Sequence, residues 1–189
     1  MLLKCGRTST EILAMRRQKL LPLVVACLLS AVTSAQAPEP WHDDLIDHFA
    51  GTWTLTGNVM GREAHHEVQA EWVLNHQFLC IHEKTPASAV AAGERPYEAI
   101  WFLGYDSTSE RYVLHLMDVY GPRFSEILGF GTREGNQVRF VFEYPDGPFH
   151  NTWRFDPAKG RWEWLMEQKD KSGKWAPFAE LRLTQAAKP

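Results

Sequence analysis

Ten segments with strand-like sequence follow one another between Gly51 and Thr184, about a dozen residues apart, and they limit the fold more than any other feature. In the first segment Trp53, Leu55 and Val59 alternate with polar residues, which is the period of a strand with one buried face. The turns between segments are rich in Gly, Pro, Asp and Asn, as tight strand connections require. The predicted strands are 51–60, 65–74, 77–85, 97–105, 111–120, 124–132, 137–144, 149–155, 161–169 and 177–184.

Short turns between successive strands make each strand antiparallel to the next. An open sheet of this size would leave two long edges, and closure removes them. We therefore predict an all-β fold, an up-and-down antiparallel barrel of about ten strands. The strand at 97–105 is apolar on both sides, which predicts that both its faces are covered. A short helix is predicted over 43–49, capped by Asp43 or Asp44.

Residues 1–37 have the order of a secretory signal peptide, with a basic cluster at 16–19, an apolar run, and small residues before the cleavage point. Residues 1–14 precede a methionine next to that cluster, so we predict that they lie upstream of the true start. The apolar run is shorter than a membrane span requires, and an uncleaved N-terminal anchor is the alternative. The mature protein is then expected in the periplasm or outside the cell. Its predicted parts are a linker at 38–42, a barrel domain at 43–185 and a tail at 186–189.

Residues 1–37 contain five basic residues and one acidic residue, so cleavage leaves 15 Lys and Arg against 22 Asp and Glu, a net charge of −7. This negative balance argues against nucleic acid and against an anionic membrane surface as the main partner. No stable membrane insertion is expected after cleavage. Of the three cysteines only Cys80 remains, so one mature chain has no internal disulfide, and we interpret Cys80 as a small buried hydrophobe.

The motif Gly51-Thr52-Trp53, with a short helix before it, resembles the calycin superfamily of lipocalins, fatty-acid-binding proteins and nitrobindin-like barrels. A wider set of motifs resembles a bacterial family of calycin-like barrels of unknown function, over residues 49–183. These motifs are Gly104-Tyr105-Asp106, Gly129-Phe130-Gly131 and Trp175-Ala176-Pro177-Phe178-Ala179. The resemblance implies structural roles for Gly51 and Trp53, with Trp53 at the closed end of the barrel. It also implies that Arg182 of the last strand stacks on the Trp53 ring as a cation–π contact.

Three polar residues interrupt apolar alternation. They are His115 between Val113 and Met117, Glu126 between Phe124 and Leu128, and Asn151 between Phe149 and Trp153. An unpaired polar group in a dry core costs on the order of 2–7 kcal/mol, so each needs a partner, a water or a ligand. If they face a cavity, they are expected to fix the polar end of a ligand whose apolar part contacts Trp101, Phe142, Trp153 and Trp164. The alternative is that they face outward or pair with one another.

No motif for nucleophilic catalysis or phosphate binding is present, so no catalytic residue is predicted. His65 and His66 are adjacent and point to opposite faces of a strand, while His76 and His82 lie about 20 Å apart along one, so no metal ligands are predicted. No cofactor is expected. Haem is the alternative, because nitrobindin-like barrels bind it through a His near the end of the chain, but no His follows His150 here.

The sequence therefore favours an exported barrel that binds a small apolar or amphipathic molecule without catalysis, and it leaves the oligomeric state open. One alternative is an enzyme or haem protein in which His115 and nearby carboxylates act as acid–base or metal groups. The other is a barrel filled by its own aromatic residues that serves as a structural or interaction module. Aromatic residues make up 12% of the chain, with 8 Trp, and they suit a ligand cavity and a filled β core alike.

Overall fold

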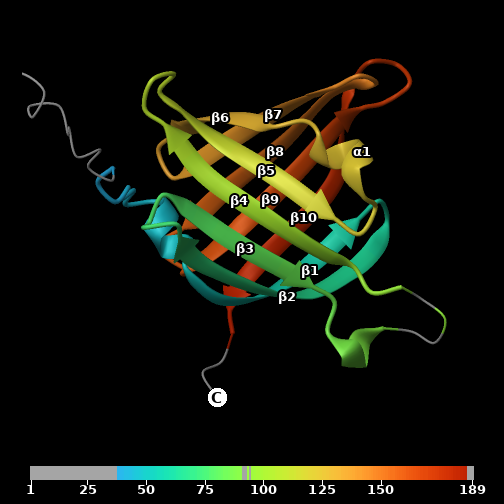
Figure 1. Cartoon of the computed structure of the whole chain (residues 1–189). Helices are drawn as coiled ribbons and strands as arrows, with labels where there is room; N and C mark the ends of the chain where they lie inside the picture. Colours follow the sequence, from blue (N-terminus) through green and yellow to red (C-terminus); the bar gives the residue numbers. More distant parts are fainter. Residues whose placement is uncertain (1–37, 91–92, 94, 187–189) are drawn as a thin grey trace, which may run out of the picture. The chain divides into compact units, whose positions relative to one another are not determined.

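The computed structural model describes residues 38–90, 93 and 95–186, so the predictions for 1–37 fall outside the described residues. Ten antiparallel strands form one closed barrel in which β1 pairs with both β2 and β10 (Figure 1). The strands are β1 (Gly51–Val59), β2 (Arg62–Val73), β3 (Phe78–Lys84), β4 (Glu98–Asp106), β5 (Arg111–Asp118), β6 (Gly129–Glu134), β7 (Gln137–Tyr144), β8 (Gly147–Asp156), β9 (Arg161–Lys169) and β10 (Trp175–Gln185). The predicted all-β, ten-stranded antiparallel barrel is thereby confirmed.

Short helical segments lie at the two ends of the barrel. The predicted N-terminal helix is present as a 3₁₀ turn, η1 (Ile46–Phe49), and a second 3₁₀ turn, η2 (Ala87–Ala89), follows β3. The connection from β5 to β6 contains α1 (Pro122–Ser125), so the prediction of a strand from residue 124 was wrong. Proline suits the first turn of a helix, where its missing N–H has no partner to lose. None of the helices in the described part of the chain has the length and apolarity that a membrane crossing requires.

The alternation of each strand sends one set of side chains into the barrel, where large aromatic and aliphatic residues form a single core. The largest fully buried side chains are Trp53, Trp153, Trp162, Trp164, Phe49, Phe140 and Phe142. Phe49 of η1 contacts three of these rings, with centroid distances of 5.0 Å to Trp162, 5.3 Å to Trp153 and 5.8 Å to Trp164. Thus η1 closes one end of the barrel, and α1 lies at the other end (Figure 1).

Asp43 holds η1 against the closed end. Its Oδ1 accepts hydrogen bonds from the backbone N–H groups of Leu45 and Ile46, both at 2.9 Å, which is the capping contact expected from the sequence. Its other oxygen accepts the hydroxyl hydrogen of Tyr112 in β5. Arg133 of β6 lies 3.2 Å from the same carboxylate. One carboxylate therefore joins the N-terminal segment to two strands of the barrel.

Replacing Asp43 with alanine is expected to lower the free energy of unfolding by about 2–4 kcal/mol, because a cap and a partly buried hydroxyl lose their partner together. Urea unfolding followed by Trp fluorescence measures the loss. Asp44→Ala is the matched control: that carboxylate is 84% exposed and pairs with Arg133 at the surface, so the expected loss is about 0–1 kcal/mol. Equal losses in the two variants would contradict the anchoring role of Asp43.

Candidate functional site

Three tryptophans from opposite walls form a layer across the barrel interior. Trp153 of β8 and Trp164 of β9 stack with their ring centroids 4.8 Å apart. Trp101 of β4, across the barrel in the strand order, meets both edge-on at 6.3 and 5.9 Å. Such offset and edge-to-face contacts are the favourable geometries of aromatic pairs. We call this layer the tryptophan floor. It lies between the η1 end and the α1 end of the core.

Asn151 lies on the α1 side of this floor, on the β8 wall. It is fully buried between Phe140 and Met166 on the neighbouring strands, and neither its Oδ1 nor its Nδ2 has a hydrogen-bond partner in the described structure. The indole Nε1 atoms of Trp153 and Trp164 are also buried without a partner among the described residues. A neutral polar group in this condition costs about 1–3 kcal/mol. The β8–β9 wall therefore carries several hydrogen-bonding groups that no described residue satisfies.

Glu83 lies on the opposite wall, because β3 is five strands away from β8 in either direction around the barrel. Although it is a charged residue, Glu83 is only 4% exposed and faces inward with Leu79 and Ile81. The N–H groups of His66 Nδ1, at 2.6 Å, and Trp101 Nε1, at 3.2 Å, donate to its two oxygens. This carboxylate is thus held at a fixed place beside the tryptophan floor.

Asp118 of β5 completes the acidic side of the interior. Burial raises the pKa of Asp118, and the nearby Glu83 carboxylate adds to the effect, while the Tyr120 N–H opposes it. Burial and then the carboxylates of Glu83 and Asp118 raise the pKa of the Tyr97 hydroxyl well above its usual range. Burial followed by Asp118 and Asp146 raises the pKa of Tyr144 to about 12. Two carboxylates and two neutral tyrosines therefore line this end of the barrel.

The raised pKa of Asp118 predicts how stability depends on pH. The folded protein holds the Asp118 proton above the unfolded value of about 3.8, so this group stabilises the fold at low pH. That contribution is lost as the pH rises through the folded-state pKa. Asp118→Asn removes the loss, so the stability of the variant relative to the wild type should increase as the pH rises above about 4. Thermal unfolding followed by circular dichroism over this range tests the sign, and an unchanged difference at every pH would contradict it.

The structure brings together five of the seven predicted ligand-binding residues in the core. Those five are Trp101, Phe142, Asn151, Trp153 and Trp164. His115 and Glu126 do not join them. His115 lies on the outer face of β5, where its Nε2 donates to the Ser125 carbonyl of α1 at 2.7 Å, and Glu126 is exposed just after α1. The expectation that these two face a cavity was wrong, since β5 is apolar on both faces and α1 replaces the start of the predicted sixth strand.

Of the residues predicted to have structural roles, Trp53 lies where it was expected and Arg182 does not. Trp53 is buried beside η1, and its Nε1 donates to the Phe49 carbonyl at 2.7 Å. Arg182 instead pairs in register with Thr56 and is exposed on the outer face. The predicted stacking of Arg182 on Trp53 was therefore wrong, because the alternation of β10 turns Leu181 and Leu183 inward and Arg182 outward.

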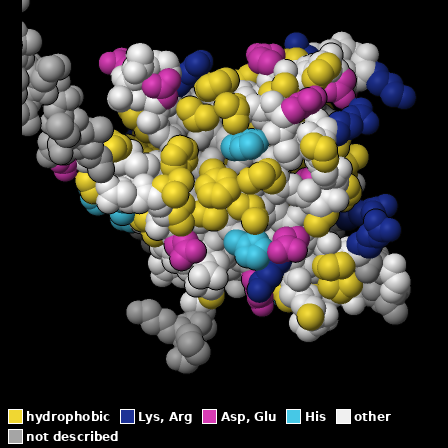
Figure 2. All heavy atoms as spheres, viewed as in Figure 1, with side chains coloured by type: hydrophobic (Ala, Val, Ile, Leu, Met, Phe, Trp, Pro, Cys, Tyr) yellow, Lys and Arg dark blue, Asp and Glu magenta, His cyan; other side chains and the backbone are white. Residues whose placement is uncertain are grey.

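The outer face of β3, β4, β5 and β6 carries an apolar patch (Figure 2). His115 lies on the same face, because it pairs in register with Phe102. Its exposed members are Phe78, Ile100, Met117, Leu128 and Phe130. Ile100 is 37% exposed, so the prediction that both faces of its strand are covered was wrong for the described residues. Cys80 is half-buried on this face, and burial raises the pKa of its thiol, which keeps the thiol protonated and weakly reactive.

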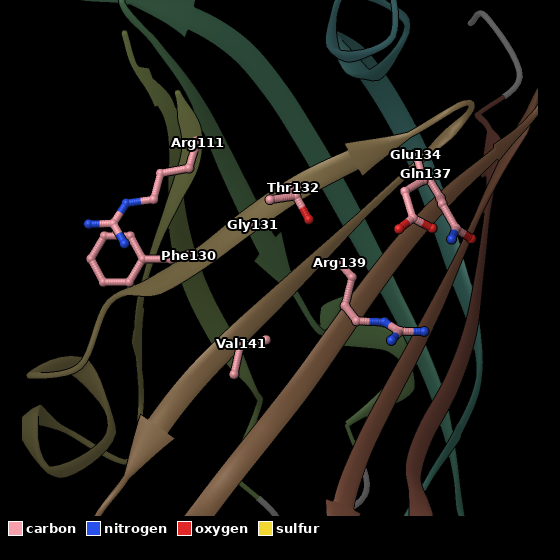
Figure 3. A pocket seen from close by; sticks show the side chains of 8 residues that line it. All are labelled: Arg111, Phe130, Gly131, Thr132, Glu134, Gln137, Arg139 and Val141. Atoms are coloured by element: carbon pink, nitrogen blue, oxygen red, sulfur yellow. The ribbon is translucent and has the colours of Figure 1, made fainter. Parts of the chain in front are cut away.

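Two of the pockets in the described part of the chain lie on the outer surface. One, of about 320 Å³, lies over β5, β6 and β7, where Arg111 stacks on the Phe130 ring at 3.8 Å and Arg139 extends from β7 (Figure 3). The other, of about 540 Å³, lies at the β6–β7 and β8–β9 turns and mixes both charges, with Arg154 paired to Glu163. Neither is lined by the predicted ligand-binding residues.

Sequence reasoning missed His66, Glu83 and Asp118. The signal for Glu83 was present, because Leu79, Ile81 and Glu83 occupy alternate positions of one predicted strand and so share a face. Sequence reasoning also did not group His42, Asp47 and His76, whose donor atoms lie within 4.8 Å of one another, because they come from separate segments and show no motif.

Comparison with models of known protein families gives no match, and comparison with curated protein sequences gives none. The chain is therefore described by its fold: a closed antiparallel barrel of ten strands, consistent with a calycin-like architecture.

Proposed function

We propose that this protein is an exported barrel that binds a small amphipathic molecule in the interior above the tryptophan floor, at the end that faces α1. The main support for this proposal is Asn151. Its amide is fully buried and faces into the barrel, and neither of its polar atoms has a hydrogen-bond partner among the described residues. Folding the chain around such a group costs free energy, and a bound polar group recovers it. The apolar part of the molecule would contact Phe142, Phe149 and Met166 on the same wall.

The charge of the interior indicates which head group is preferred. Glu83 and Asp118 are both acidic, and His66 is the one basic side chain that contacts them among the described residues. An ammonium group is attracted by carboxylates in a poorly hydrated site and by the faces of nearby aromatic rings, here Trp101 and Tyr97. A carboxylate head group would be repelled by the same wall. The site therefore favours an amphipathic amine over a fatty acid.

Binding of dodecylamine and dodecanoate, which share an alkyl chain and differ in head-group charge, tests this proposal. Below their micelle concentrations, dodecylamine should quench the emission of the interior tryptophans with a dissociation constant at least about tenfold lower than that of dodecanoate. Native mass spectrometry of the purified protein would identify a co-purified molecule directly. No response of the interior tryptophans to either probe would reject the proposal.

Asn151→Leu separates stability from binding. Leucine is similar in size to asparagine but has no amide that needs a partner, so the free energy of unfolding should rise by about 1–2 kcal/mol. The affinity for dodecylamine should fall about tenfold. Thr152→Val is the matched control. The Thr152 hydroxyl is also buried and unpaired, but it points away from the interior, so the variant should gain stability and keep its affinity. An Asn151→Leu variant that binds the probe as well as the wild type would contradict the interior site.

A second candidate function is a structural or interaction module with a filled interior. The ring contacts of Trp101, Trp153, Trp164 and Phe49 favour it, because they already occupy the core at the closed end. The alternative of an interior acid–base or haem-binding group relied on His115, but His115 lies on the outer face, where it contacts the Ser125 carbonyl. The probe titration distinguishes the two remaining functions, since a filled barrel leaves the tryptophan emission unchanged.

A further inference from the structure

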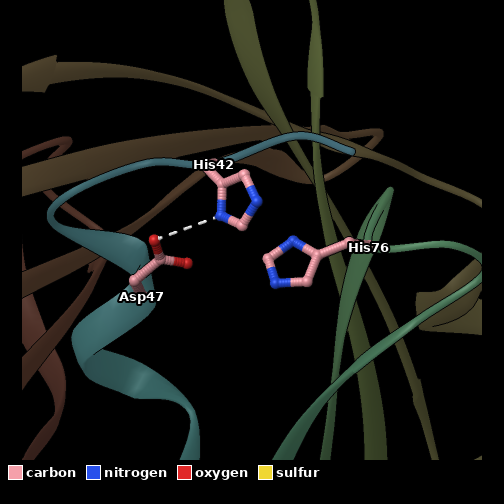
Figure 4. A group of neighbouring side chains, drawn as sticks. All are labelled: His42, Asp47 and His76. Carbon is pink, nitrogen blue, oxygen red and sulfur yellow. Dashed lines mark ion pairs between the residues drawn. The ribbon is translucent and has the colours of Figure 1, made fainter. Parts of the chain in front are cut away.

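We infer that His42, Asp47 and His76 form a binding site for a divalent transition-metal ion, with Zn²⁺ as the best match, at the closed end of the barrel. One donor atom from each residue lies within 4.8 Å of the other two. The three side chains converge from different parts of the chain (Figure 4). This site is separate from the interior and does not depend on the proposed ligand.

The three residues are fixed by the backbone around them. His42 precedes η1 and Asp47 lies in its first turn, where the Asp47 N–H donates to the Asp43 carbonyl at 2.8 Å. His76 lies in the turn between β2 and β3, and its carbonyl accepts the N–H of Trp41 at 3.1 Å. The N-terminal segment and the β2–β3 turn are thus hydrogen-bonded directly beside the three ligands.

His76 is oriented as a metal ligand. Its Nδ1 lies 2.6 Å from the Trp41 carbonyl, and a carbonyl only accepts, so Nδ1 carries the hydrogen. The other ring nitrogen, Nε2, then has a free lone pair. The ring also stacks on Trp72 with a centroid distance of 4.0 Å. A backbone carbonyl that fixes the tautomer and direction of a histidine is the usual support of metal-binding imidazoles.

The spacing needs only small movements to receive the ion. Ligand atoms about 2.0–2.1 Å from a tetrahedral Zn²⁺ lie about 3.4 Å from one another. His42 Nδ1 and Asp47 Oδ2 are already 3.7 Å apart. The His42 side chain is 67% exposed, and its ring already lies against the His76 ring, with the two centroids 4.3 Å apart. Two imidazoles and one carboxylate suit Zn²⁺, whereas Mg²⁺ and Ca²⁺ prefer oxygen ligands.

Calorimetric titration of the untagged full-length protein with ZnCl₂ tests this site. We expect one Zn²⁺ per chain, no binding of Mg²⁺, and a rise in the unfolding midpoint of about 5–10 °C at a Zn²⁺ concentration a hundredfold above the dissociation constant. His42→Gln and Asp47→Asn should each weaken Zn²⁺ binding at least about tenfold. Both side chains are exposed enough for the variants to fold.

His82→Gln is the matched control, because His82 is also partly exposed and also contacts a carboxylate, Glu98, but has no third ligand beside it among the residues that the structure describes. This variant should bind Zn²⁺ as the wild type does. The inference is overturned if Zn²⁺ binds no tighter than about 0.1 mM, or if His82→Gln weakens binding as much as His42→Gln. Since neither His42 nor Asp47 touches the interior, these outcomes leave the dodecylamine titration unaffected.

Discussion

Gly57→Ala is expected to lower the free energy of unfolding by about 4 kcal/mol or more, the largest loss expected for adding one methyl group to the barrel. A Cβ atom on Gly57 would lie 2.1 Å from the Glu180 carbonyl oxygen and 2.9 Å from the Leu181 Cα atom. Both are backbone atoms of β10, so no side-chain rotation relieves the contact. The φ angle of +151° adds strain for any other residue. β1 and β10 must separate locally, at the seam that closes the barrel.

Gly61→Ala is the control for the backbone angle alone. Gly61 also has a positive φ angle, +82°, but nothing lies within 4 Å of the Cβ position. Its expected cost is about 1 kcal/mol, and the difference between the two variants in urea unfolding measures the contact with β10. Similar losses in both variants would show that β1 and β10 tolerate separation at Gly57.

The second large effect is expected for Trp153→Ala, which should lower the free energy of unfolding by about 3–5 kcal/mol. The Trp153 side chain is fully buried and its ring contacts Phe49, Phe140 and Trp164. Its removal leaves a space in the centre of the core that these neighbours fill only in part. Equilibrium unfolding in urea, followed by circular dichroism, measures the loss.

Trp175→Ala is the comparison for this variant. Trp175 is half-buried at the start of β10 and stacks on His150 with a centroid distance of 3.7 Å, outside the core. Its expected cost is about 1 kcal/mol or less. If Trp153→Ala costs no more than Trp175→Ala, the tryptophan floor is not packed, and the interior is larger than its ring contacts indicate.

The strands could be predicted because local information determines them. Alternation, as in Trp53 and Leu55, and turns built from Gly, Pro, Asp and Asn recur at each hairpin, and the observed strands follow the predicted ones closely. α1 was missed because four residues, starting at Pro122, are too few to show a helical period. Asn151 was placed in the interior since its flanking residues Phe149 and Trp153 share its face.

Which face of a strand points into the barrel was harder to predict where both faces are apolar. His115 shares its face with Val113 and Met117, which suggests a core, yet that face is the outer one and only α1 covers part of it. The partners of Glu83 depend on neighbouring strands, and the ligands of the inferred metal site meet only when the β2–β3 turn folds against the N-terminal segment. Such contacts lie beyond any local pattern.

The pairing of β1 with β10 also governs when the fold can form. The first strand of the barrel finds one of its two neighbours only in the last, so a chain emerging from the ribosome cannot complete its hydrogen-bond network until residues 175–185 are available. Until then both sheet edges stay unsatisfied and open to unwanted association. The barrel can therefore close only after residues 175–185 have been synthesised, and translation of β10, not of any inner strand, is the earliest moment at which the fold can be completed.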